Sequence, residues 1–165
     1  MSGPATHGTR WFLPSTPAAV GIARDRAIAS LRLWGIYLDS DCEDSVRLLV
    51  SELVTNAVLH DPGPLVTVGL YVGVNEQTVM VEVLDVNRDQ PAARRASEQA
   101  EGGRGLFLVD ALTSGRWGTT PMAKGKRVWG ALPLPDQPRA ARRRQLLDSL
   151  IRAARPNPYR INATT

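Results

Sequence analysis

Three stretches of the chain carry apolar residues at intervals of three and four, which is the period of an amphipathic helix. These stretches are residues 17–34, Asp41–His60 and Gly105–Leu112. Elsewhere the apolar residues alternate with polar ones, as they do in strands. The alternation predicts strands over the ranges 9–13 (TRWFL), 65–72, 78–84, 115–118 and 127–132. The order of these elements predicts an α+β fold, a two-layer α/β sandwich with a mixed, mostly antiparallel sheet and helices on one face.

Small and polar residues mark the ends of the predicted helices. Thr16 is a suitable N-cap for the first helix, with Pro17 at the first helical position. Gly35 is a suitable C-cap for the same helix. Asp39 or Ser40 can cap the second helix in the same way that Thr16 caps the first.

The remaining segments set the predicted domain organisation. Residues 1–8 are small and polar and are predicted to be disordered, and residues 9–135 are predicted to form one domain. Within that domain, residues 86–102 lack periodicity, which is typical of a functional or mobile insertion such as a lid. Residues 136–165 form a basic tail that is predicted to be partly helical.

The positive charge is concentrated in that tail. The chain has a formal net charge of +4, and residues 136–165 hold seven arginines against two aspartates. The other 135 residues are close to neutral, so a basic domain that clasps nucleic acid is not indicated. Binding of the arginine tail to nucleic acid, or to an acidic protein partner, stays open.

Composition also limits the cellular setting and the covalent chemistry. The N-terminus lacks the basic and apolar regions of a signal peptide, and no apolar run is long enough to span a membrane. Cys42 is the only cysteine, so neither an internal disulfide nor a cysteine metal cluster is possible. We expect a cytoplasmic protein without a membrane partner, in which Cys42 is a neutral bystander.

The helix Asp41–His60 combines an apolar arc with an unusual polar edge. Its arc is formed by Val46, Val50, Leu53, Val54 and Ala57. Glu52, Asn56 and His60 follow one another at four-residue spacing, which places them on one stripe beside this arc. Such polar groups must pair with neighbours or line a cavity. The helix alone leaves open whether this edge meets solvent or a ligand.

A glycine-rich segment favours the ligand. Residues 102–109 read GGRGLFLV, and consecutive glycines allow a backbone to approach a ligand closely and to expose its N–H groups. Where such a loop opens a helix, the amides and the helix dipole favour phosphate. The oxygen of Asn56 suits Mg²⁺ beside phosphates, and Glu52 can accept a proton from a nucleophile. Asp85, after a predicted strand, can accept a hydrogen bond from an exocyclic amine such as the N6 of adenine.

These motifs, in this order, carry a resemblance. Glu52, Asn56 and Ala57, then Asp85, then the segment from Gly103 to Val109 resemble the histidine kinase-like (GHKL) ATP-binding superfamily, whose fold is the Bergerat fold. The stretches SELVTNAVLH and GRWG…GKRVWGALPLP are similar to the small bacterial anti-sigma-factor serine/threonine kinases and their stand-alone ATP-binding relatives. The resemblance covers roughly residues 10–133 and implies ATP and Mg²⁺ as cofactors.

The resemblance also implies roles for single residues. Asn56 becomes the Mg²⁺ ligand and Glu52 the candidate general base, while Asp85 recognises adenine. The cofactor-binding set is completed by Asn87, Gly103, Arg104, Gly105 and Leu106.

The chain also departs from the family pattern at the adenine end. Asn87 stands where the family often has a glycine. Arg127 stands where a threonine commonly supports the adenine aspartate. His60 is interpreted mainly as a helix-end capping and packing residue, with contact to a ligand as the alternative. Lys126 is interpreted as a surface lysine, with a place at the border of the pocket as the alternative.

Two functions remain open for such a pocket. The first is an anti-sigma-factor-like kinase that transfers a phosphoryl group from MgATP to a serine on a small antagonist protein and also holds a sigma factor. The alternative is a non-catalytic, nucleotide-gated protein-binding module in a similar partner-switching pathway. A histidine kinase catalytic domain is less favoured, because residues 1–8 leave no room for a helical dimerisation segment with a phosphoacceptor histidine. A homodimer is implied by the resemblance alone.

Overall fold

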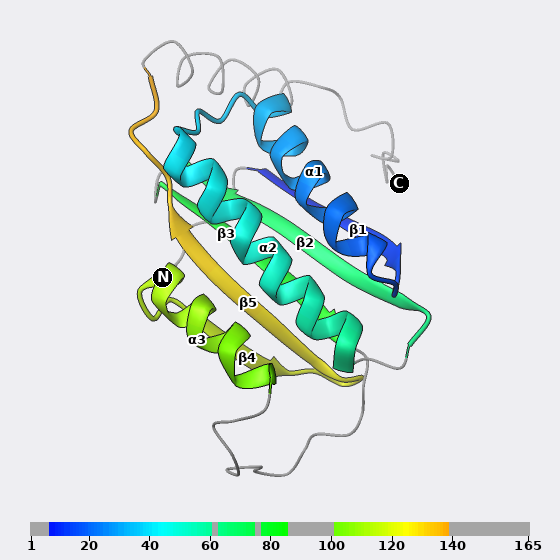
Figure 1. The fold of residues 1–165 in the computed structure, drawn as a ribbon. Helices are drawn as coiled ribbons and strands as arrows, with labels where there is room; N and C mark the ends of the chain where they lie inside the picture. The colour runs from blue at the N-terminus through cyan, green and yellow to red at the C-terminus, as the bar shows by residue number, and fades with distance from the viewer. Residues whose placement is uncertain (1–6, 61–62, 75–76, 86–100, 139–165) are drawn as a thin grey trace, which may run out of the picture.

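The computed structural model describes residues 7–60, 63–74, 77–85 and 101–138 (Figure 1). Within these ranges the chain forms a five-stranded sheet and a layer of helices. The elements are β1 (His7–Pro14), α1 (Ala18–Leu33), α2 (Ser40–His60), β2 (Leu65–Gly73), β3 (Thr78–Asp85), α3 (Glu101–Thr113), β4 (Trp117–Pro121) and β5 (Lys126–Pro133).

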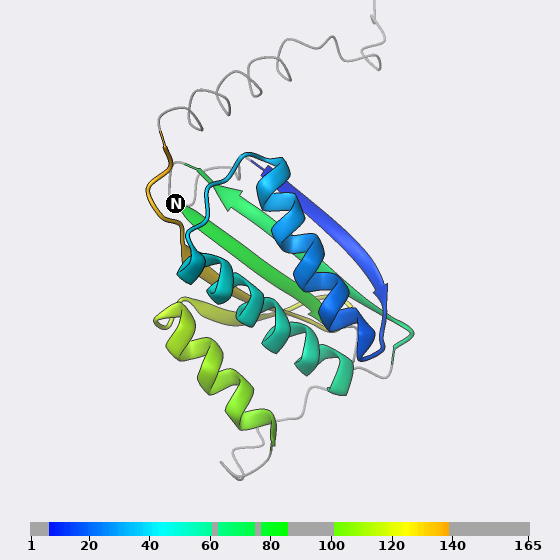
Figure 2. The same ribbon diagram turned by 45° about the horizontal axis from the view of Figure 1, so that its top comes forward.

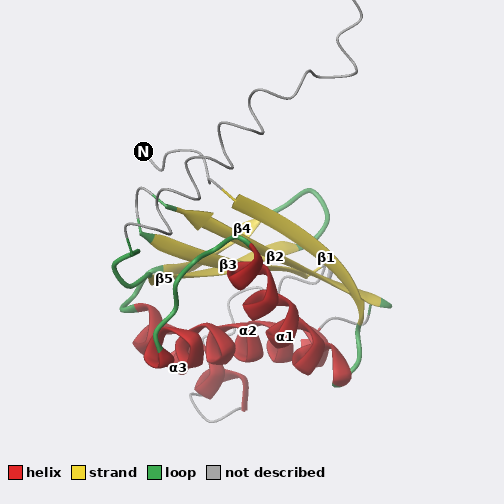
Figure 3. Cartoon of the chain, turned by 90° about the horizontal axis from the view of Figure 1, so that it is seen from above, coloured by secondary structure: helices red, strands yellow, loops and turns green. Residues whose placement is uncertain are grey.

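All three of these helices cover the same face of the sheet, as Figure 3 shows from above. The strand order is β1-β2-β3-β5-β4, and every pairing between described strands is antiparallel. The predicted two-layer α+β sandwich is therefore confirmed, whereas the mixed sheet is wrong. The reason lies in the connection through α1 and α2, which returns the chain to the end where β1 finished, so that Pro14 pairs with Leu65.

The core lies between α2 and the central strands. The inward residues of β2 and β3 are all at most 1% exposed, and they are Val66, Val68, Leu70, Val72, Val79, Val81 and Val83. Helix α2 packs over β2, β3 and β5, with α1 and α3 on its two sides (Figure 2). The apolar arc predicted for this helix is buried at all five positions. The central helix is thus fixed on three sides, which leaves its polar edge in a defined position.

The connection between α1 and α2 largely follows the predicted capping signals. Gly35 has a φ of +72°, and the N–H groups of Gly35 and Ile36 donate to the carbonyls of Arg32 and Leu31 in a Schellman pattern. Asp39 Oδ1 accepts a 2.8 Å hydrogen bond from the Cys42 N–H, so Asp39 is the N-cap of α2. The predicted cap of α1 is wrong, because the N-cap position is occupied by Pro17 without any side-chain hydrogen bond.

Both ends of the domain extend beyond the predicted boundaries. His7 belongs to β1 and is 6% exposed, because its ring stacks on Trp34 at a centroid distance of 5.3 Å. Gln137 is 5% exposed, accepting a hydrogen bond from the Tyr37 N–H and donating to the Tyr37 carbonyl. The buried amide of Gln137 fastens the chain after β5 to the loop between α1 and α2.

Residues 139–165 lie outside the described residues, and the predicted tail helix lies there. None of the helices in the described ranges combines the length and apolar character that crossing a membrane requires.

Candidate functional site

The polar edge of α2 faces the start of α3. A Cβ added to Gly105 would lie 3.0 Å from Glu52 Oε2 and 3.2 Å from Asn56 Oδ1. Gly105 itself is buried, so the α3 backbone approaches these two side chains as closely as a residue without a side chain allows. Glu52 and Asn56 therefore face the start of α3, although both residues stay partly exposed to solvent.

The glycine-rich segment differs from its prediction in one respect. Helix α3 begins at Glu101 rather than at Gly105, so Gly103 and Gly105 lie within the helix and not in a loop before it. The first four N–H groups of any helix have no acceptor inside that helix. In α3 these belong to residues 101–104, directly before the glycine that touches α2. The segment therefore keeps the free amides and the dipole that favour an anion, although as a helix N-terminus.

Leu106 and Val109 explain why this segment is helical. Val109 is fully buried in the core, and Leu106 is partly buried one turn earlier. Their burial against α2 holds the helix together despite glycines that cost about 1 kcal/mol each in a helix interior. The sequence shows the glycines but not this packing, so the predicted start was four residues late.

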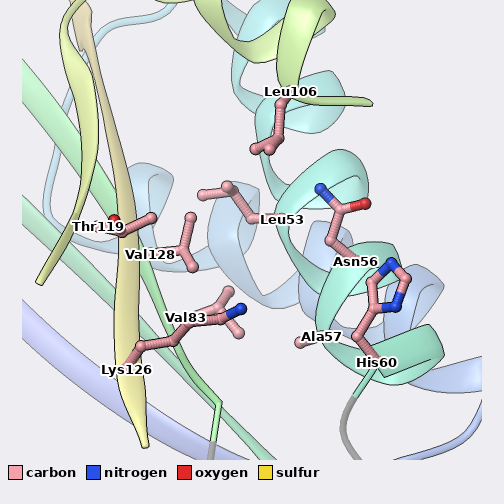
Figure 4. Close-up of a pocket in the computed structure, with 9 residues that line it drawn as sticks. All are labelled: Leu53, Asn56, Ala57, His60, Val83, Leu106, Thr119, Lys126 and Val128. Atoms are coloured by element: carbon pink, nitrogen blue, oxygen red, sulfur yellow. The ribbon is translucent and has the colours of Figure 1, made fainter. Parts of the chain in front are cut away.

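A pocket opens between α2, the start of α3 and the sheet (Figure 4). Its volume is about 120 Å³, and it is lined by Leu53, Asn56, Ala57, His60, Val83, Leu106, Thr119, Lys126 and Val128. Pockets for whole ligands measure roughly 300–1,000 Å³, so the described residues enclose only part of a nucleotide-sized site. Both walls combine apolar residues with polar ones, which are Asn56 and His60 on α2 and Thr119 and Lys126 on the sheet, and such a lining suits a flat ring system joined to charged groups.

Two residues that the sequence placed in the ligand site only as the less favoured alternative line this pocket. His60 is part of the α2 wall, and Lys126 extends from the start of β5 toward α2 (Figure 4). The alternative that Lys126 borders the pocket is therefore the correct one, and His60 lines the pocket as well. Thr119, on β4, was missed altogether. The alternation of side chains along a strand is the signal that could have identified Thr119, because Thr119 is the register partner of the pocket residue Val128.

The expected adenine end of the site lies where β3 finishes. Asp85 is the last residue of β3 and the register partner of Lys126. The side chains of Asp85 and Arg104 are outside what the structure describes, and Asn87 lies wholly outside the described residues. The geometry therefore brings together Glu52, Asn56, Gly105 and Leu106 of the predicted set. It also places the Asp85 backbone beside the same pocket.

Arg127 does not occupy the place of a threonine that supports Asp85. It pairs with Leu84 in the ladder, and its Nη1 lies 3.5 Å from Glu82 Oε2. Because successive residues of a strand alternate between faces, Lys126 and Val128 line the pocket while Arg127 serves the opposite face. The predicted replacement at this position is wrong.

The possible metal chemistry is limited to a site that a ligand completes. Among the described residues, no three His, Cys, Asp or Glu side chains cluster closely enough to hold an ion by themselves. Mg²⁺ is commonly held by one or two protein oxygens together with phosphates and water. Asn56 Oδ1, close to Gly105, fits as the protein oxygen of that type of site.

Cys42 takes no part in this chemistry. It is buried, and desolvation together with the nearby Asp39 raises the pKa of its thiol to about 11. Almost no thiolate is therefore present at neutral pH, and the expectation of a neutral bystander is confirmed.

Comparison with known proteins gives the same answer as the geometry. The family model described as "Histidine kinase-like ATPase domain" matches residues 13–115, well over half of the chain. This range includes α2, the end of β3 and the whole of α3. No curated protein matches the chain. The ordered motifs, the sheet with helices on one face and the pocket thus agree with the family match, and the chain belongs to the histidine kinase-like ATPase domain family of ATP-binding proteins.

Proposed function

We propose that this protein is an MgATP-dependent serine kinase of the anti-sigma-factor type, which phosphorylates a small antagonist protein. The observation that supports the proposal is the close approach of Gly105 to both Glu52 and Asn56, where even an added Cβ would lie only 3.0 Å from Glu52 Oε2 and 3.2 Å from Asn56 Oδ1. It joins the α2 motif to the glycine motif without an intervening side chain. A carboxylate next to the expected phosphate position is what transfer to a hydroxyl requires.

Each polar residue of the site has a distinct role in the proposed reaction. Glu52 accepts the proton of the serine hydroxyl while the serine oxygen forms its bond to the γ-phosphorus. The bond from the γ-phosphorus to the bridging oxygen of ADP breaks in the same displacement. The amides that open α3 hold the phosphates, with the guanidinium of Arg104 as a further donor to them.

Asn56 and Asp85 fix the two ends of the nucleotide in this proposal. Asn56 offers its side-chain oxygen to Mg²⁺, which when bound with ATP offsets the charge of the phosphates. Asp85 accepts a hydrogen bond from the adenine N6 amine. The apolar residues Val83 and Val128 provide the surface between these two ends.

The partner assignment has separate support. It rests on the similarity of SELVTNAVLH and of the closing β5 segment to anti-sigma-factor kinases. A sigma factor and a serine-bearing antagonist are accordingly the proposed partners, in a pathway where phosphorylation releases one in favour of the other. Homodimerisation and a cytoplasmic location are part of the same proposal.

The experiment combines labelled ATP with the purified protein and the candidate antagonist encoded by a neighbouring gene. Wild type is expected to bind MgATP in calorimetry and to transfer label to a serine. Asn56→Ala is expected to lose most of the MgATP affinity. Glu52→Gln is expected to bind MgATP and to lose transfer, whereas Asp44→Asn, an exposed carboxylate on the same helix, should leave both unchanged.

Three results would contradict the proposal in different ways. Wild type that does not bind MgATP would refute the nucleotide site itself. Phosphoryl transfer that persists in Glu52→Gln would show that Glu52 is not the general base. MgATP binding that changes partner affinity without any phosphotransfer would favour the non-catalytic, nucleotide-gated module instead.

A further inference from the structure

Lys126 is the one lysine among the residues that line the described pocket. It is the first residue of β5, and its side chain extends beside Val83 toward α2 (Figure 4). Lys124, two residues earlier in the turn before β5, is exposed and does not line the pocket. The placement of Lys126 is thus a property of the strand register and not of a generally basic loop.

The register also ties Lys126 to the residue expected to recognise adenine. Asp85 and Lys126 are direct partners at the last step of the β3–β5 ladder. The backbone register therefore puts these two residues at the same step of the ladder, at the start of β5 where Lys126 lines the pocket.

This pairing is complementary to one edge of adenine. The N6 amine donates a hydrogen bond, and the adjacent ring nitrogen N1 accepts one. A carboxylate accepts from the amine, while a lysine ammonium, which has three donors and no acceptor, can donate to N1. The usual alternative donor on the last strand is absent here, because Arg127 is engaged with Glu82 on the opposite face.

We propose that Lys126 is a specificity-determining residue that donates a hydrogen bond to N1 of the adenine ring. The inference rests on the proposed adenine contact of Asp85 and deepens it. Val83 and Val128 line the same pocket as Lys126 and offer apolar surface to the ring. Binding is then selective for a base that presents a hydrogen-bond donor to Asp85 and an adjacent acceptor to Lys126, as the N6 amine and N1 of adenine do.

The test compares ATP with its 1-deaza analogue, in which a C–H group replaces N1. Wild type should bind MgATP about tenfold more tightly than the analogue, which corresponds to one hydrogen bond to a charged group. Lys126→Met should bind both nucleotides equally, with the affinity that wild type has for the analogue. ADP should show the same loss as ATP, since the contact is to the base and not to the γ-phosphate.

Two control variants make the result specific. Lys124→Met removes an exposed lysine of the same turn and should retain the tenfold preference. Thr119→Val removes the other hydrogen-bond donor on the sheet side of the pocket and should also retain it. Thermal unfolding of each variant shows whether the fold persists.

The outcomes separate this inference from the proposed function. If wild type binds MgATP but does not distinguish it from the analogue, only the Lys126 assignment is overturned. The Lys126 assignment is also overturned if Lys126→Met still prefers ATP to the 1-deaza analogue, or if this variant loses affinity for both nucleotides by the same factor. Loss of the preference for ATP in Thr119→Val would overturn it too. If wild type binds neither nucleotide, the proposed function fails and this inference fails with it.

Discussion

Two glutamates of this domain are held in opposite ways. Glu82, on β3, is 2% exposed and accepts 2.8 Å hydrogen bonds from Arg10 and from the Tyr71 hydroxyl, with Arg127 at 3.5 Å. Glu52, on α2, is partly exposed, and within the described part of the chain it forms no hydrogen bond or ion pair. Glu82 is thus a carboxylate whose hydrogen-bonding capacity is used by the fold, whereas that of Glu52 is not used within the described part of the chain.

The surroundings of Glu82 show what full pairing entails. The hydrogen bond with Glu82, followed by that with Tyr71, raises the pKa of Arg10 above its ordinary value. Desolvation and the hydrogen bond to Glu82 raise the pKa of the Tyr71 phenol. Gly69, opposite Glu82 in the ladder, leaves room for this carboxylate. On the face of the sheet opposite the three described helices, the strands are therefore joined by a charged cluster, whereas the face under these helices is joined by a hydrophobic core.

The largest expected difference between the two glutamates is in catalysis. We expect Glu52→Gln to lower the rate of phosphoryl transfer by roughly 10²–10⁴-fold, the usual contribution of a general base. The affinity for MgATP and the melting temperature should hardly change. Glu82→Gln, measured as rate per folded molecule, should stay within about threefold of wild type because Glu82 lies on the other face of the sheet. Equal rate losses in the two variants would show that Glu52 and Glu82 do not differ in their contribution to catalysis.

For the free energy of unfolding we expect the reverse order, with a larger loss in Glu82→Gln than in Glu52→Gln. Removing the charge of Glu82 leaves two guanidinium groups without their buried partner, which costs several kcal/mol where all groups are buried. Arg10 and Arg127 retain 47% and 37% side-chain exposure, so we expect a loss of about 2 kcal/mol. Urea unfolding of Glu82→Gln at neutral pH measures this value, with Glu52→Gln as the matched control that should unfold like wild type. A Glu82→Gln protein as stable as wild type would show that the cluster contributes no net stability.

Each glutamate also faces a glycine, which gives a third contrast. A Cβ on Gly69 would lie 2.7 Å from Glu82 Cγ and 2.9 Å from Tyr71 Cε2, within a cluster that cannot easily move. Gly69→Ala should therefore destabilise the domain by about 1 kcal/mol.

The glycine beside Glu52 should respond differently. A Cβ on Gly105 would meet the end of the Glu52 side chain at 3.0 Å, and this end can shift. Gly105→Ala should leave the urea midpoint nearly unchanged and should weaken MgATP binding about tenfold, because the methyl group fills the space beside the phosphates. A loss of stability without a loss of affinity would indicate that Gly105 serves packing alone.

The sequence predicts the environment of Glu52 better than that of Glu82. Helix α2 was predictable because its apolar arc repeats with helical period and because Glu52 and Asn56 stand beside that arc. Asp39 and Gly35 were predictable as helix ends from local chemistry. These features depend on residues that are neighbours in the chain or one helical turn apart.

The remaining features depend on register and packing between distant segments. Glu82 is buried only because Arg10 and Arg127 arrive from other strands, and no local pattern singles it out. The opposite roles of Lys126 and Arg127 follow from their pairing with Asp85 and Leu84, which a sequence does not specify. The early start of α3 depends likewise on the burial of Val109 against α2.

The smallest expected effect concerns Tyr71 and the pH dependence of the Glu82 cluster. Because its pKa is raised in the folded state, the Tyr71 phenol binds its proton more tightly folded than unfolded. Its contribution to stability is therefore complete below the unfolded pKa of about 10 and is lost as the pH rises through the higher folded pKa. Tyr71→Phe should lower the free energy of unfolding by about 1 kcal/mol at pH 8, the value of one hydrogen bond. It should also flatten the decline in urea midpoint between about pH 9 and pH 11, and a decline as steep as in wild type would assign that pH dependence to groups other than Tyr71.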